Sequence, residues 1–385
     1  MAAVELQISV ILLFALAGYL LASRINQSAV VGIIIIGIII GPSIFSIVQY
    51  SDAVKMLAHL GAIMLLFAIG LEFRIKDVYQ IKYMFIALIG VVVPWAAGYF
   101  LGNLFGYNFN ESMFIGVALT ATSIAITASV LQEMKKLNTP AAKAIIGAAV
   151  IDDVLGLLAL SITIQSTRAE NIAVLGILII AIESIVFLSA CIFAAPYIKR
   201  IFLRLDEAGF AKKHPHLLFI TAIMLCFFYS SAAELLGLSA IVGAFLAGAA
   251  LEGIRFKNSK DLKDGAEYLH VIFGAIFFIS LGILANLREL SPGILPFFII
   301  LLLVAVFSKV AGCGIASRLA GFNKTESLVI GFGMSPRGEV AMIAALIGLT
   351  SNIIKQDVYV SIVAMSLLTT MLTPFVIRNY IKWDA

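Results

Sequence analysis

Ala149-Val-Ile-Asp152-Asp153-Val-Leu-Gly156 places two adjacent carboxylates in the middle of an apolar run that extends from about residue 141 to residue 164. A helix of that length crosses a hydrocarbon core of about 30 Å, so both carboxylates fall near the middle of a membrane. An ionised aspartate there costs at least about 2.5 kcal/mol, and acids at this depth usually mark ion or proton pathways. A structural pair, held by a buried cation or by helix backbone groups, is the alternative. Fold stability needs no second carboxylate, so the pair indicates a site for a cation or for protons.

The composition outside this stretch is that of a membrane protein. Of the 385 residues, 62% are hydrophobic and 12% are charged, and the mean hydropathy is +1.09. Soluble domains carry about 25% charged residues, so the composition predicts an all-α polytopic membrane protein in contact with the lipid bilayer. The net charge of +4 arises in the loops and indicates no nucleic-acid partner. The three cysteines lie inside apolar runs without metal-ligand spacing and predict no disulfide framework.

Apolar stretches bounded by charged or turn residues predict about 13 transmembrane helices. The first is too long for a signal-peptide core, so we expect it to be retained as a helix. The weakest boundary is Leu235-Leu-Gly-Leu238, between the eighth and ninth spans. The predicted spans are 6–22, 30–48, 53–72, 82–104, 112–131, 140–165, 171–196, 216–236, 238–254, 267–286, 293–317, 325–349 and 357–380.

The distribution of basic residues supports this count and orients the chain. With the N-terminus outside and the C-terminus in the cytoplasm, most of the 26 Lys and Arg residues fall in cytoplasmic connections. Only four fall in external connections: Lys55, Arg168, Arg288 and Lys355. Cytoplasmic loops of membrane proteins carry such an excess of positive charge. The asymmetry therefore favours 13 spans with the N-terminus outside.

Two spans in corresponding halves of the chain are interrupted by polar, Gly or Pro residues. Spans 1–6 and 8–13 form units that begin on opposite sides of the membrane, which is the inverted-repeat arrangement of many transporters. Their fifth members contain Gly116-Val-Ala-Leu-Thr-Ala-Thr-Ser-Ile-Ala-Ile-Thr127 and Gly331-Phe-Gly-Met-Ser-Pro-Arg-Gly-Glu-Val340. Pro336 and its flanking glycines predict a break near residues 335–338. Broken helices free carbonyls and helix ends toward a cavity, so we expect the two breaks to cross near a transport site.

The two aspartates project about 100° apart on one helix, so only one of them can face a given cavity squarely. A hard monovalent cation such as Na⁺ prefers oxygen ligands. One carboxylate of the pair could supply them together with hydroxyls and freed carbonyls of Thr122, Ser123 and Thr127. The alternative for these hydroxyls is bonding to the carbonyls of their own helix.

Other charged residues lie within or beside the predicted spans. Lys309 is about mid-span and needs a partner, for which a carboxylate of the aspartate pair is the first candidate and another acid the alternative. Arg337 and Glu339 lie in the interrupted span, where they either balance charge at the crossing or form an ion pair that holds the break in shape. Glu72, at a cytoplasmic helix end, is a secondary candidate that could simply be solvated.

These residues together resemble a known family over essentially the whole chain. The pattern is similar to the monovalent cation:proton antiporter family, in its electrogenic sodium/proton antiporter branch (NapA-like, distantly NhaA-like). The Asp-Asp pair resembles the pair found in the electrogenic members of this family, whereas Asn-Asp accompanies electroneutral exchangers and Gln-Asp accompanies the glutathione-gated potassium systems. The motifs that carry the resemblance are Gly37-Ile-Ile-Ile-Gly-Pro42, Gly70-Leu-Glu72, Thr120-Ala-Thr-Ser-Ile-Ala-Ile-Thr127, Ile151-Asp-Asp153, Lys309 and Gly333-Met-Ser-Pro-Arg-Gly-Glu339.

The resemblance implies roles for individual residues and an NhaA-like antiporter fold. Asp153 would be the ligand of Na⁺, and Asp152 would form a salt bridge with Lys309. Thr122 and Ser123 would lie at the first helix crossing, and the segment from Ser335 through Arg337 to Glu339 at the second. The resemblance also implies a homodimer, with a scaffold domain formed by 1–81 and 197–290, a core transport domain formed by 82–165 and 291–385, and a linking helix at 166–196.

The predicted function is electrogenic exchange of cytoplasmic Na⁺ or Li⁺ for external protons by alternating access. The protein is expected in a prokaryotic cell (inner) membrane, where this exchange would contribute to pH homeostasis. No cofactor is expected besides the transported Na⁺ and H⁺. The alternatives are a potassium/proton antiporter on the same scaffold and a sodium-coupled symporter of organic anions. An intramembrane aspartyl protease is excluded, because its two acids converge from separate helices, which adjacent residues cannot do. The chain is therefore expected to be a transporter and not an enzyme.

Overall fold

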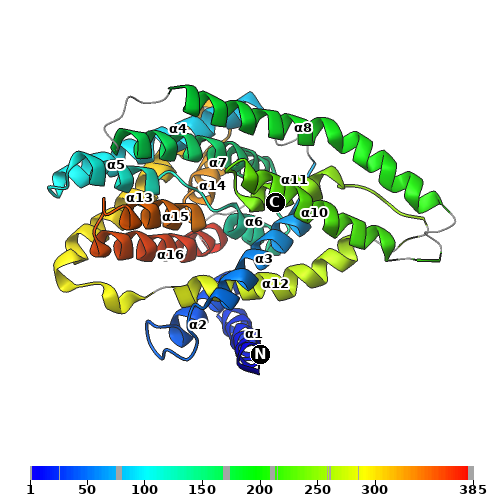
Figure 1. The fold of residues 1–385 in the computed structure, drawn as a ribbon, viewed down its shortest axis with the longest axis horizontal. Coiled ribbons are helices and arrows are strands. Elements are labelled where there is room, and N and C mark those ends of the chain that lie inside the picture. Colours follow the sequence, from blue (N-terminus) through cyan, green and yellow to red (C-terminus); the bar gives the residue numbers. More distant parts are fainter. Residues whose placement is uncertain are drawn as a thin grey trace.

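A computed structural model of the chain describes residues 2–25, 27–74, 80–167, 174–208, 213–214, 216–257, 259, 262–284 and 286–379. Within these ranges the chain forms only helices and the turns and loops between them (Figure 1). Nine helices have 19 residues or more: α1 (Ala2–Arg24), α3 (Asp52–Gly70), α4 (Ile81–Leu104), α7 (Pro140–Thr167), α8 (Val174–Glu207), α10 (Leu217–Leu235), α12 (Leu262–Leu284), α13 (Leu295–Leu319) and α16 (Gln356–Asn379).

The described part of the chain also contains shorter elements. Helices of 10–12 residues are α2 (Ala29–Ile40), α5 (Phe109–Ala118), α6 (Ile124–Glu133), α11 (Ala240–Ala250), α14 (Lys324–Gly333) and α15 (Glu339–Thr350), and two 3-10 turns are η2 (Leu287–Glu289) and η3 (Pro292–Ile294). The nine long helices are apolar and long enough to cross a membrane, and four of the shorter ones are apolar as well. The prediction of an all-α polytopic fold is therefore confirmed, whereas the count of 13 spans stays a prediction.

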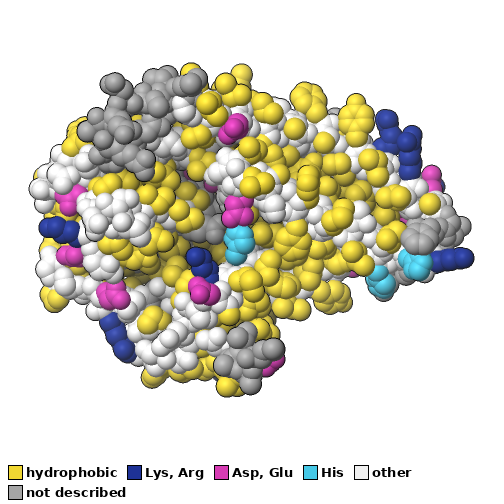
Figure 2. Space-filling model, in the orientation of Figure 1, with side chains coloured by type: hydrophobic (Ala, Val, Ile, Leu, Met, Phe, Trp, Pro, Cys, Tyr) yellow, Lys and Arg dark blue, Asp and Glu magenta, His cyan; other side chains and the backbone are white. Residues whose placement is uncertain are grey.

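The surface of the described residues is apolar over much of its area. Large hydrophobic side chains are exposed on α1, α8, α10 and α13, including Leu13, Phe193, Phe228 and Phe307. Figure 2 shows hydrophobic side chains across the face in view, with Lys and Arg side chains at both ends of the molecule and near its middle. Soluble proteins do not expose apolar surface on this scale, so the exposed side chains on these helices are consistent with contact with lipid.

Two predicted boundaries are wrong. The predicted span 30–48 is helical only in its first part, because α2 ends at Ile40, where Gly41 leaves the helical conformation and Pro42 cannot continue the helical hydrogen bonds. The predicted span at 171–196 was expected to end there, but α8 runs on to Glu207. The C-terminal part of α8 contacts the α11–α12 connection. The buried side chain of Asp206, on α8, accepts hydrogen bonds from the backbone N–H groups of Lys257 and Ser259 in that connection, at 2.6 and 2.8 Å.

The helices pack in two sets, each of which combines helices from both halves of the chain. In one set α3 packs against α11 and α12, and α12 packs against α2. The approach of α2 to α12 depends on glycine, because a Cβ built on Gly37 would lie 2.3 Å from the carbonyl oxygen of Ile279, and one on Gly282 would lie 2.3 Å from that of Ile34. In the other set α4 packs against α5, α7 and α13, and α13 packs against α14 and α16.

The two interrupted spans begin with the same local structure. Asn108 caps α5 and Asn323 caps α14, each in a reciprocal capping box with the glutamate three residues later. The sequences Gly106-Tyr-Asn-Phe-Asn-Glu-Ser112 and Gly321-Phe-Asn-Lys-Thr-Glu-Ser327 share the pattern, and Gly106 and Gly321 both adopt positive φ. Only glycine takes this conformation without strain. This internal repeat places α5–α6 and α14–α15 as equivalent elements of the two halves.

Candidate ion-binding site

The breaks in the two interrupted spans lie at residues 119–123 and 334–338, where they cross each other. The backbone N–H of Ser123 donates to the carbonyl oxygen of Pro336 at 2.9 Å. The hydroxyl of Thr122 donates to the carbonyl of Met334 at 3.3 Å, and that of Thr127 donates to the carbonyl of Gly333 at 2.6 Å. The carbonyls of Gly333 and Met334 end α14 and have no helical partner, so the hydroxyls of Thr122 and Thr127 join the two broken spans instead of bonding within their own helix.

Helix α16 forms hydrogen bonds with the second break. The hydroxyl of Ser335 lies 2.7 Å from that of Thr373, and both side chains are buried. The backbone N–H of Arg337 donates to the Thr369 hydroxyl at 3.1 Å, and the Thr370 hydroxyl donates to the Arg337 carbonyl at 3.0 Å. Ser335 and Arg337 therefore lie at the second break, which crosses the first.

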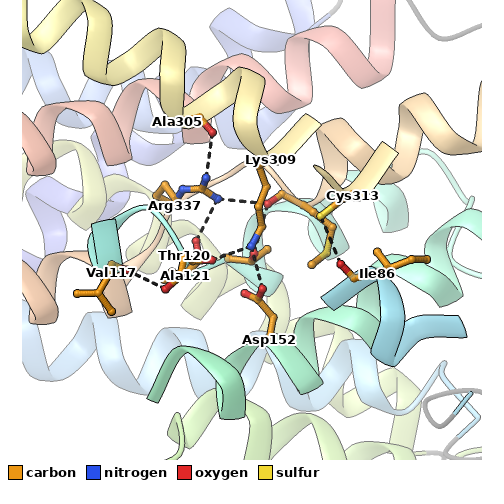
Figure 3. A network of polar contacts seen from close by, with 11 residues as sticks. Ile86, Val117, Thr120, Ala121, Asp152, Ala305, Lys309, Cys313 and Arg337 are labelled. Atoms are coloured by element: carbon orange, nitrogen blue, oxygen red, sulfur yellow. Dashed lines mark hydrogen bonds and ion pairs between the residues drawn. The ribbon is translucent and has the colours of Figure 1, made fainter. Parts of the chain in front are cut away.

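Arg337 is 1% exposed and binds backbone carbonyls (Figure 3). Its Nη2 donates to Ala305 at 2.9 Å, and its Nη1 donates to Ala121 at 3.2 Å and Met334 at 3.4 Å. Carbonyls at the C-terminal ends of helices carry partial negative charge, which a cation stabilises. The guanidinium thus neutralises both breaks at once. The side chain of Glu339, which we expected to contribute a charge here, lies outside the described residues.

Lys309 and Asp152 form a buried ion pair beside the same crossing. The Nζ of Lys309 lies 2.8 Å from Oδ1 of Asp152 and also donates to the carbonyl of Thr120 at 2.7 Å. The two side chains are 0% and 1% exposed. Figure 3 shows Lys309 reaching from α13 toward Asp152 on α7, with the first break beside it. The partner of the mid-span lysine is therefore the first aspartate of the pair.

Asp153 points elsewhere, as the helical angle between the two aspartates requires. It lines a small cavity of about 30 Å³ that lies between the crossing and α11. The walls include Thr122 and Ser123 from the first break, Gly338 from the second, and Ser239 and Ile241 from the start of α11. A space of this size holds about one water molecule. The two aspartates thus have separate surroundings, one in an ion pair and one beside a cavity.

Glu72 is placed away from this cavity. It follows α3 and accepts a hydrogen bond from Nε2 of Gln132 on α6 at 3.1 Å. Sequence reasoning missed other participants, namely the carbonyls of Thr120, Ala121 and Ala305 and the backbone of Ser239. Backbone groups carry no residue-type signal, so only the predicted breaks pointed to the carbonyls.

The described residues contain no group of three or more His, Cys, Asp or Glu side chains placed to hold a metal ion. A tightly bound multivalent metal would need such a group. The cavity instead offers one carboxylate, hydroxyls and main-chain oxygens, and these weaker oxygen ligands suit a transported monovalent cation.

Comparison with known proteins places the chain in a family. The profile described as "Sodium/hydrogen exchanger, transmembrane" matches residues 10–383. The chain belongs to the sodium/hydrogen exchanger family. It is therefore an integral membrane transporter of the monovalent cation:proton antiporter class and not an enzyme, as predicted.

Two curated relatives of this exchanger cover nearly its whole length. The probable Na⁺/H⁺ antiporter GerT of Bacillus cereus is 33% identical over 93% of this chain and 94% of its own. The Na⁺/H⁺-K⁺ antiporter GerN of the same organism is 31% identical over 96% and 94%. The sodium proton antiporter MjNhaP1 from Methanocaldococcus jannaschii, a solved structure, aligns with a TM-score of 0.73 at 15% identity over 98% of this chain and 96% of that one. That likeness confirms the predicted antiporter fold.

Proposed function

We propose that this exchanger moves Na⁺ and protons in opposite directions through one site at Asp153. The observation that carries the proposal is the separation of the two aspartates. Asp152 is held by Lys309 at 2.8 Å, whereas Asp153 lines the cavity at the helix crossing. A carboxylate on a water-sized cavity can bind either a cation or a proton, and a transported ion must occupy its site reversibly. Na⁺ and protons then compete for Asp153.

The cation's other ligands come from the first break. Thr122 and Ser123 line the cavity with Asp153. Their hydroxyl and carbonyl oxygens are hard ligands that suit Na⁺ or Li⁺. Thr127 is not among the residues that line the cavity, and its hydroxyl donates to Gly333 at 2.6 Å, so in the proposal it holds the crossing together and does not bind the ion.

Electrogenic exchange follows from the buried ion pair. If two protons enter for each Na⁺ that leaves, Asp153 carries one and the Asp152–Lys309 pair accepts or releases the other. One net charge then crosses the membrane in each cycle, and the membrane potential contributes about 2.3 kcal/mol per 100 mV to it.

Alternating access requires one part of the protein to move against another. The proposed moving core is 82–165 with 291–385, and the proposed scaffold is 1–81 with 197–290, joined by the linking helix predicted at 166–196. The packing of α3 with α11 and α12, and of α4 with α13, is compatible with this division. A homodimer held by the scaffold, the N-terminus outside and a location in the prokaryotic inner membrane complete the proposal.

One of the relatives supports K⁺ as an alternative substrate. The relative GerN is described as a Na⁺/H⁺-K⁺ antiporter. The relative GerT is described as a probable Na⁺/H⁺ antiporter, which favours Na⁺. We therefore propose Na⁺ or Li⁺ as the substrate, with K⁺ as the alternative.

Proteoliposomes that contain the purified exchanger and a pH-sensitive dye test the proposal. A Na⁺ gradient should drive proton movement in the wild type, Li⁺ should substitute for Na⁺, and K⁺ should be much less effective. Asp153→Asn should abolish the exchange, because an amide carries no charge and takes up no proton. Glu183→Gln, which changes an exposed acid on α8, is the matched control and should retain it. Exchange that survives in Asp153→Asn would refute the site assignment.

A further inference from the structure

Asp153 has a protein partner that neither the sequence patterns nor the proposed function uses. Its Oδ2 accepts a hydrogen bond from the backbone N–H of Ser239 at 2.9 Å. Ser239 is the N-cap residue of α11, 86 residues away in the chain. Asp153 lies in the proposed core and Ser239 in the proposed scaffold, so this hydrogen bond joins the two parts that must move against each other.

The start of α11 is suited to hold an anion. The Ser239 side chain caps the helix by accepting the backbone N–H of Ile241 at 3.2 Å. The N-terminal end of a helix carries partial positive charge, which attracts a carboxylate. Ser239, Ile241 and Asp153 also line the same cavity. The carboxylate that we assign to the cation is therefore already engaged by a positive group on the opposite wall of the cation's cavity.

The internal repeat supplies an independent observation. Helix α2 begins with Ser28-Ala-Val-Val-Gly32 and α11 with Ser239-Ala-Ile-Val-Gly243, and both serines cap through the N–H two residues later. The start of α2 also receives a carboxylate from the proposed core, because Glu133 at the end of α6 interacts with the Ser28 side chain and with the backbone at Val30. In both halves a Ser-capped scaffold helix thus meets a core carboxylate.

We propose that the N-terminus of α11 is a latch that holds Asp153 while the site is empty and that Na⁺ must displace to bind. This inference rests on the proposed role of Asp153 and adds a positioning residue, Ser239, to it. The backbone N–H stabilises the unloaded carboxylate, which weakens the apparent affinity for Na⁺. Because the latch joins core to scaffold, its release on cation binding ties loading of the site to freedom of the core to move.

Removal of the N–H tests the latch. Ser239 has φ −64°, which matches the fixed φ of proline, so Ser239→Pro deletes the donor with little change of backbone. The reference is Ser239→Ala, which loses the same hydroxyl but keeps the N–H. The dissociation constant for Na⁺, measured on purified protein at alkaline pH, should be roughly tenfold lower in Ser239→Pro than in Ser239→Ala, as expected for loss of a hydrogen bond to a charged group. Damage to the fold would weaken binding instead of tightening it.

The repeat provides a control for proline at a helix cap. Ser28 has φ −62°, and Ser28→Pro alters the equivalent cap of α2, which faces Glu133 and not Asp153. It should not tighten Na⁺ binding. Equal affinities in Ser239→Pro and Ser239→Ala, or an equal tightening in Ser28→Pro, would overturn the latch.

A second measurement covers the case in which Ser239→Pro does not fold. Ser239→Cys keeps the N–H and places a thiol beside the cavity, while the three native cysteines are buried, so the wild type gives the background. Saturating Na⁺ should change the alkylation rate of this thiol severalfold, and the Na⁺ effect should disappear when Asp153→Asn is added. Equal rates with and without Na⁺, in protein that binds Na⁺, would overturn the latch. Failure of the wild type to bind Na⁺ would instead refute the proposed function.

Discussion

The Nζ of Lys309 lies 2.8 Å from Oδ1 of Asp152, and both side chains are almost fully buried. The lysine also donates to the Thr120 carbonyl at 2.7 Å, so the ammonium group binds both Asp152 and the first break. Burial of two charges is tolerated only with such partners. The pair thus connects α13, α7 and the broken α5–α6 span at one point.

Lys309→Gln leaves Asp152 buried without a charge partner. Loss of one member of a buried pair costs about 3–5 kcal/mol, so we expect a clearly lower unfolding temperature in detergent. The double variant Lys309→Gln with Asp152→Asn removes both charges and should recover part of that loss. If the pair carries a proton, Lys309→Gln should also weaken the transport current on a supported membrane. Unchanged electrogenicity in the single variant would mean that the lysine is only structural.

Arg337→Lys tests the neutralisation of both breaks. A lysine ammonium lacks the planar fork that lets Arg337 reach carbonyls of Ala121 and Ala305 together. Hydrogen bonds to charged groups contribute about 1.5–3 kcal/mol each, so we expect a loss of at least about 2 kcal/mol in the free energy of unfolding. The control is Arg318→Lys, because Arg318 is exposed and donates to the Phe322 carbonyl at the end of α13. An equal and small effect in both variants would contradict the role of Arg337.

Gly338→Ala tests the close approach of the two breaks. A Cβ built on Gly338 would lie 2.8 Å from both Cβ and Oγ of Ser123, so the crossing must open. We expect a loss of about 1–3 kcal/mol, typical of overpacking, measured by thermal unfolding. Ser123→Gly in the same chain removes the clash and should restore much of the stability. Gly293→Ala is the control, because a Cβ there meets nothing within 4 Å. Destabilisation that Ser123→Gly leaves unrelieved would argue against the crossing geometry.

The features that the sequence predicted well are those that depend on residue type. Pro336 and its glycines placed the second break, and the mid-span position of Lys309 predicted that it would find a carboxylate partner. Two apolar runs joined through Gly237 were separated correctly, because this glycine adopts positive φ between α10 and α11. These signals act locally, through backbone conformation or through the cost of an unpaired buried charge.

The features that could not be predicted depend on which backbone groups meet in space. The acceptors of Arg337 are carbonyls from three separate segments, and the donor to Asp153 is the N–H of Ser239. Every residue carries such groups, so only the crossing itself selects them. The paired capping boxes at Asn108 and Asn323, by contrast, could have been found by aligning the two halves of the sequence.

Competition between Na⁺ and protons predicts a pH-dependent Michaelis constant. In the proposed mechanism Na⁺ binds the deprotonated carboxylate of Asp153, so a fall in pH adds a competing proton and raises the KM for Na⁺. With one competing proton, KM should rise by about tenfold per pH unit once protonation dominates, while the maximal rate at saturating Na⁺ changes less. Initial rates in proteoliposomes at several external pH values check this. A KM independent of pH would separate the proton pathway from the cation site.

The most direct test of the shared site is the number of protons released when Na⁺ binds to the purified exchanger. Calorimetric titrations in buffers of different ionisation enthalpy measure this number without any membrane. Near the pH at which Asp153 is half protonated, the wild type should release protons as Na⁺ binds, and Asp153→Asn should neither bind Na⁺ nor release protons. Na⁺ binding without proton release in the wild type, or binding that persists in Asp153→Asn, would contradict exchange at Asp153.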